Sequence, residues 1–163
     1  MTETTPRKTL VLDSNLIVLY VVGALDKNLL RRHRRTQAYV PEDFELLLDI
    51  MAKFSEVATT PNCLTEASNL LRHGHSKEQL MGVLAGFIGE SREEYVRSST
   101  VVGGSQFSRL GLADCALANA FTTHACFLTD DFGLYLYLHN RGLLQSTSTT
   151  SERGHGRGAR NGW

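Results

Sequence analysis

Several features that would indicate other classes of protein are missing from this sequence. The three cysteines, Cys63, Cys115 and Cys126, are far apart and form no CxxC pair, which favours a reduced, intracellular protein. The first eight residues lack the layout of a signal peptide, and the apolar run from Leu16 to Leu25 is too short to span a bilayer. We therefore expect a soluble, cytoplasmic protein.

The chain also lacks an excess of charge of either sign. Lysine plus arginine number 17 and aspartate plus glutamate number 17, so any binding to nucleic acid must come from a local patch. A length of 163 residues with 42% hydrophobic content is enough for one domain with a core. We predict a lead over residues 1–8, one domain over 9–145, and a flexible tail rich in Ser, Thr, Gly and Arg over 146–163.

Short apolar runs alternate with segments of helical periodicity. The runs at 9–13, 56–60 and 125–129 are typical of buried strands, and a short extended piece is expected at 100–104. Helical patterns cover 14–23, 41–54, 61–74, 76–89, 112–121 and 131–142. A helical arm that ends in RRHRR is expected before the helix at 41–54, and a capping box of Ser76 with Gln79 is expected at the start of the helix at 76–89. This alternation predicts an α/β domain with a mainly parallel sheet.

Four acidic residues fall near the predicted strand ends. Asp13 ends the first strand, Glu66 lies in the first turns after the second, Asp114 opens a helix, and Asp131 follows the strand at 125–129. Ligands of parallel sheets bind beyond the carboxyl ends of the strands, and clustered carboxylates repel one another unless a cation neutralises them. Oxygen ligands of this kind suit Mg²⁺ or Mn²⁺, which would polarise a phosphodiester. The pattern indicates a metal-dependent phosphodiesterase or nuclease.

Each acid also has an ordinary structural explanation. Asp13 could cap the next helix, and either Asp130 or Asp131 could cap the last one. Glu66 could be an exposed helix residue, and Asp114 could complement a helix dipole. Their joint placement at one edge of the sheet is what favours a site.

The four segments that contain these acids resemble, in order, the acidic motifs of the PIN-domain nucleases. They read LVLDSNLIV, TPNCLTEASNLL, GLADCALANA and FLTDDFGLYL, and the similarity runs from Thr9 to Leu144. The resemblance implies a Rossmann-like three-layer α/β/α sandwich with a mainly parallel sheet. It also implies an endoribonuclease that depends on Mg²⁺ or Mn²⁺.

The resemblance assigns roles by motif position. Its metal-binding and catalytic acids would be Asp13, Glu66, Asp114 and Asp131. Asp131 is preferred to Asp130 because the family pattern reads Thr, any residue, Asp. Asn15 and Thr129 match supporting polar positions, and Asp130 would be a neighbour of the ligands or the helix cap.

The smallest members of the family are toxins of toxin–antitoxin systems, so the expected partners are an RNA substrate, an antitoxin protein and a second copy of the chain. The segment between Asp13 and Glu66 is longer than in those compact toxins, and the polar tail is additional, which weighs against a toxin role. The main alternative is a catalytically silent PIN-like module that binds RNA or a protein partner. A receiver domain would need a late strand-end lysine, and a haloacid-dehalogenase-type phosphatase would need Asp-x-Asp where this chain has DSN.

Other polar and aromatic residues are further candidates for a site. The RRHRR run supplies RNA-binding candidates, because arginine pairs with phosphate, although such a run is more often a solvated helix end. These candidates are Arg31, Arg32, Arg34 and Arg35. His73 and His75 with Cys63 do not have the spacing of a zinc site. Tyr135 and Tyr137 could stack bases, whereas Phe127 belongs in the core.

Overall fold

A computed structural model describes residues 8–121 and 124–143, so the predicted tail over 146–163 and nearly all of the predicted lead lie outside the described residues. Within them, four strands form one parallel sheet in the order β3-β2-β1-β4. The strands are β1 (Thr9–Leu12), β2 (Glu56–Thr59), β3 (Arg92–Glu93) and β4 (Ala125–Leu128). The predicted α/β class with a parallel sheet is confirmed.

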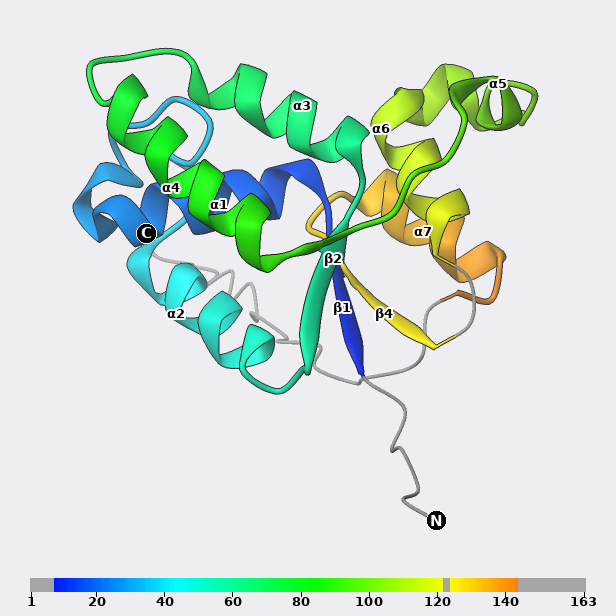
Figure 1. Cartoon of the computed structure of the whole chain (residues 1–163), viewed down its shortest axis with the longest axis horizontal. Coiled ribbons are helices and arrows are strands. Elements are labelled where there is room, and N and C mark those ends of the chain that lie inside the picture. Colours follow the sequence, from blue (N-terminus) through cyan, green and yellow to red (C-terminus); the bar gives the residue numbers. More distant parts are fainter. Residues whose placement is uncertain (1–7, 122–123, 144–163) are drawn as a thin grey trace, which may run out of the picture.

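Helices cover both faces of this sheet. They are α1 (Ser14–Leu25), the 3-10 turn η1 (Lys27–Leu29), α2 (Pro41–Met51), α3 (Pro61–Leu71), α4 (Lys77–Glu90), α5 (Ser98–Val101), α6 (Phe107–Ala120) and α7 (Phe132–Asn140). Figure 1 shows α1, α2 and α4 on one side of the strands and α5, α6 and α7 on the other. The helix α3 packs against both α1 and α6. This is the three-layer arrangement of a Rossmann-like sandwich.

The central strand is the most deeply buried part of the sheet. Leu10, Val11 and Leu12 have no exposed surface, because β1 has a hydrogen-bonded neighbour on each side and helices above and below. Ile17 and Val21 of α1 are equally buried against it. One hydrophobic cluster therefore joins the sheet to the helices. No helix in the described part of the chain is long and apolar enough to cross a membrane.

Three local predictions were wrong. The arm before α2 is not a helix: after η1 the chain runs through turns, and the hydroxyl of buried Thr36 donates to the Leu30 carbonyl at 2.8 Å, which closes a loop in place of helical hydrogen bonds. Residues 98–101 form α5 where an extended piece was predicted at 100–104. Ser76 precedes α4 with φ −98° and ψ 19°, outside the extended conformation of a capping residue, and makes no side-chain cap.

Candidate functional site

Asp13 lies at the junction between β1 and α1. Its side chain is 2% exposed, and Oδ1 accepts a hydrogen bond from the Leu16 backbone N–H at 2.9 Å, which caps α1. The Thr129 hydroxyl donates to Oδ2 from the end of β4. The strand-end position and the capping role predicted for Asp13 thus occur together. Two donors from different elements fix this carboxylate at the carboxyl edge of the sheet.

Asp114 reaches the same edge because α6 is broken. Gly111 has φ 81° and ψ 177°, so the helix restarts after it and places Asp114 in the first turn of the second half. A residue with a side chain would be strained at this positive φ. The predicted position of Asp114 at a helix start is therefore produced by a kink within one longer helical segment.

The electrostatics show that the four predicted acids lie near one another. Burial, followed by the negative charges of Asp13, Asp131 and Glu66, together raises the pKa of Asp114 to about 7. The pKa of Asp13 is raised to about 6, mainly by burial, with opposing effects from the Thr129 and Leu16 hydrogen bonds and a smaller rise from Asp130 and Asp131. Every effect that acts on the Asp114 pKa disfavours its charged form.

Glu66 and Asp131 are each held by a neighbouring element or by their own helix. The Ser14 hydroxyl donates to Glu66 Oε2 at 2.6 Å, which ties α3 to the start of α1. Asp131 Oδ1 accepts from the Leu134 N–H at 2.8 Å and caps α7. Thr129 Oγ1 also accepts from the Asp131 N–H at 3.0 Å, so this one hydroxyl links Asp131 to Asp13.

The adjacent carboxylates of Asp130 and Asp131 have separate roles. Asp130 accepts hydrogen bonds from the Tyr39 hydroxyl and, at 3.5 Å, from Asn15 Nδ2. It therefore connects the end of β4 to α1 and to the segment before α2. Of the two aspartates that the sequence offers as the cap of the last helix, Asp131 fills that position and Asp130 does not.

Sequence reasoning missed three residues of this region. Ser14 is 4% exposed and directly follows Asp13, which is the only sequence signal that it had. Tyr39 has no local signal, because its contact with Asp130 spans 91 residues of chain. Cys63 is fully buried close to Asp13 and Asp114, and burial raises the pKa of its thiol to about 11. Its thiol donates to the Ala113 carbonyl at 3.8 Å, which links α3 to the residue before Asp114.

The arginines of the RRHRR run lie elsewhere. All four are exposed, and Arg32 and Arg34 line a cavity with His73 and His75, just past the carboxyl end of α3. None of the four acids lines that cavity. Two of the predicted RNA-binding arginines, Arg32 and Arg34, therefore line a space that the acids do not share.

The three aromatic residues considered in the sequence have different environments in the structure. Phe127 is 7% exposed and belongs to the core, as predicted. Tyr137 packs against the core and its hydroxyl accepts from Arg141 at 3.2 Å. Tyr135 is 44% exposed and lines a cavity of about 330 Å³ with Asp130, Asp131 and others near the acids.

The donor set fits a hard divalent cation in chemistry and charge, since it consists of carboxylate oxygens that repel one another. In the described residues, however, no three His, Cys, Asp or Glu side chains are placed to hold one metal ion. A physical reason is visible in the hydrogen bonds: Asp13, Glu66 and Asp131 each accept from a donor of the protein. Metal binding would require some of these side chains to turn.

No protein-family model matches the chain, and no curated protein matches it significantly.

Proposed function

We propose that this protein is a PIN-like endoribonuclease that depends on Mg²⁺ or Mn²⁺. The observation that carries the proposal is the environment of Asp114, whose pKa is raised mainly by burial and further by three other acids from three different elements, while no neighbour lowers it. Clustered carboxylates at the carboxyl edge of a parallel sheet destabilise the fold when they are charged, unless a cation is bound. Such a cluster is therefore better explained by a ligand than by structure alone.

Asp13 and Asp114 would be the principal ligands, with Glu66 and Asp131 completing the set. When bound, the metal would neutralise these charges and polarise the phosphodiester. Asp13 is a fixed anchor, because the Leu16 N–H and the Thr129 hydroxyl hold both of its oxygens. Asp114 has to lose a proton near neutral pH before it can bind, since its pKa is about 7.

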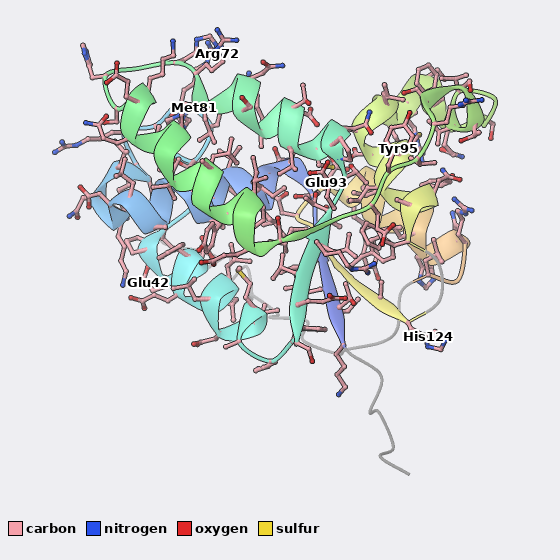
Figure 2. The ribbon with its side chains drawn as sticks, viewed as in Figure 1. Glu42, Arg72, Met81, Glu93, Tyr95 and His124 are labelled. Atoms are coloured by element: carbon pink, nitrogen blue, oxygen red, sulfur yellow. The ribbon has the colours of Figure 1, made fainter. Side chains whose placement is uncertain are left out.

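A groove beside Glu66 offers a surface for a single-stranded substrate. It has a volume of about 450 Å³ and is lined by Asn62, Glu66 and Asn69 of α3, by Ala113 of α6 and by Tyr95. Figure 2 labels Tyr95 on the segment from β3 to α5, and its side chain is 78% exposed. Amide side chains and an exposed ring suit the edges and faces of unpaired bases.

The deciding experiment is cleavage of a labelled single-stranded RNA pool in Mn²⁺, Mg²⁺ and EDTA. Asp114→Asn removes a ligand charge without changing the size of the side chain, and Asp49→Asn is the matched control, because Asp49 is an exposed residue of α2. We expect metal-dependent cleavage by the wild type and by Asp49→Asn, and loss of cleavage in Asp114→Asn. Equal cleavage by all three proteins would refute the assignment.

The second candidate is a silent PIN-like module that binds RNA or a protein without cutting it. The observation in its favour is that no three of the described acidic, histidine or cysteine side chains are placed to hold a metal. Calorimetric titration with Mn²⁺ separates the two candidates, because a silent module with this arrangement would bind no ion at the acids. The toxin role, the antitoxin partner and the homodimer stay predictions from the resemblance.

A further inference from the structure

A second cavity lies past the carboxyl end of α3. It has a volume of about 410 Å³ and is lined by parts of two segments, one after α1 and one between α3 and α4. The first contributes Arg32, His33 and Arg34, and the second contributes His73 and His75. Figure 1 shows both segments on the same side of the molecule, and Figure 2 labels Arg72 at the end of α3 there. Two basic motifs about forty residues apart in sequence therefore meet in one cavity.

The charged groups in the lining of this cavity are basic, and they stand beside the apolar side chains of Leu29 and Leu80, with no carboxylate among the lining residues. Arg32 and Arg34 are both exposed, and within the described residues neither takes part in an ion pair. Their guanidinium groups are therefore available as charged donors. A guanidinium presents several N–H groups in a planar fork, which matches the oxygens of a phosphate.

His33 adds an uncharged donor to the lining. Its side chain is 8% exposed, and Nδ1 accepts a hydrogen bond from the Arg35 backbone N–H at 3.3 Å. Burial, Arg35 and His73 lower the pKa of His33, so the neutral ring carries its proton on Nε2, the nitrogen that does not accept from Arg35. The contact with Arg35 also fixes the ring relative to the two neighbouring arginines.

The start of α4 contributes to the same place. Ser76, which lines the cavity, is the residue before α4 and makes no side-chain cap. The first N–H groups of this 14-residue helix are therefore not satisfied by the Ser76 hydroxyl. Unsatisfied N–H groups and the positive end of the helix dipole both favour an anion.

We propose that this cavity binds a phosphate group, carried either by a nucleic-acid backbone or by a small phosphorylated molecule. The proposal rests on the convergence of two arginines, three histidines and an uncapped helix start around one space. It does not depend on the ribonuclease assignment, because none of the four acids lines the cavity.

The test is a titration of the full chain with inorganic phosphate at low ionic strength, followed by the NMR signals of the histidine side chains at constant pH. We expect saturable shifts of His33, His73 and His75, and no comparable shift of His124 or His139, which lie outside the cavity. Arg32→Gln and Arg34→Gln should each weaken phosphate binding by about tenfold, the effect of one charged hydrogen bond. Arg31→Gln is the matched control, because Arg31 is in the same run but does not line the cavity.

The result that would overturn the proposal is an absence of saturable shifts in the wild type, or equal weakening by Arg31→Gln and by the two cavity variants. Thermal unfolding of each variant checks that a loss of binding is not a loss of folding. Competition by a single-stranded oligonucleotide then distinguishes the two sources of phosphate. Displacement of inorganic phosphate by the oligonucleotide supports a backbone phosphate, and phosphate binding without displacement supports a small phosphorylated ligand.

Discussion

The two ends of α3 collect charges of opposite sign, and they do so by different means. Toward its start, Cys63 lies close to Asp13 and Asp114, Asp13 is almost fully buried, and Glu66 in the second turn accepts a hydrogen bond from Ser14. Past its end, Arg32 and Arg34 are exposed on a segment of turns. The difference shows that like charges repel one another strongly where they are buried, as at the acids, and only weakly where water screens them, as at the arginines.

The largest expected effect is on affinity for Mn²⁺. If variants at the two ends of α3 changed this affinity equally, the functional difference between the two ends would be refuted. Asp114→Asn should weaken Mn²⁺ binding at least about a hundredfold, because loss of a ligand should exceed the 10- to 100-fold effect of changing an outer neighbour. Arg34→Gln, at the other end of α3, should change it less than about twofold, because exposed charges at that separation are screened by salt. Calorimetric titration with Mn²⁺ measures both variants.

The next effect is on stability without metal. The folded-state pKa of Asp114, about 7, lies above its ordinary value of 3.8, so the folded state binds its proton more tightly than the unfolded state does. The stability associated with this proton is fully present below about pH 4 and is lost as the pH rises through about 7. Asp13, with a pKa of about 6, acts in the same direction.

We therefore expect the metal-free wild type to lose stability between pH 4 and pH 8. Asp114→Asn should be more stable than the wild type by about 1–3 kcal/mol at pH 8, a range reduced for partial exposure of the group, and by almost nothing at pH 4. Urea unfolding in EDTA across this pH range measures the difference. A variant whose advantage is the same at both pH values would show that relief of charge repulsion is not its cause.

A smaller effect measures what Asp13 contributes to stability as the cap of α1. Asp13→Asn and Asp13→Ala both remove the buried charge, but only asparagine keeps an oxygen for the Leu16 N–H. The alanine variant should therefore be less stable than the asparagine variant by about 1 kcal/mol, the usual value of a helix cap. Urea unfolding of the two variants at one pH gives the comparison directly, and equal stabilities would mean that the cap contributes nothing.

The smallest effect belongs to the basic end. Arg32→Gln and Arg34→Gln should each change the free energy of unfolding by less than about 0.5 kcal/mol, because both side chains are exposed and neither is in a described ion pair. Thermal unfolding at constant pH and salt measures this change. A larger loss of unfolding free energy would mean that these arginines hold the segment after α1 in place. The two ends of α3 would then differ in the sign of their charges and not in whether those charges support the fold.

Much of the fold was accessible from the sequence because its pattern is local. The runs that became β1, β2 and β4 are continuous and apolar, and the starts of α2 and α3 carry Pro41 and Pro61. The strand β3 was missed because it has two exposed residues, Arg92 and Glu93, and is defined only by pairing with β2. No periodicity exists in two residues.

The candidate acids were also accessible, since Asp13 and Asp131 follow strands, Asp114 opens a helix, and Glu66 lies in the helix after β2. Their supporting contacts were not, because Ser14 reaches Glu66 across 52 residues of chain and Tyr39 reaches Asp130 across 91. The cavity past α3 was missed for the same reason. Its two basic motifs were both noticed in the sequence, but nothing in either one indicates the other.

The sequence by itself determined the alternation of strands and helices and the placing of an acid at the ends of β1 and β4, because these depend on neighbouring residues and on burial patterns of short period. Only the tertiary structure decided which of two adjacent carboxylates caps α7, how strongly the pKa of Asp114 is raised, and that RRHRR meets His73 and His75. Those outcomes depend on hydrogen bonds, desolvation and charge separation in space. Distances of that kind exist only once the chain has folded.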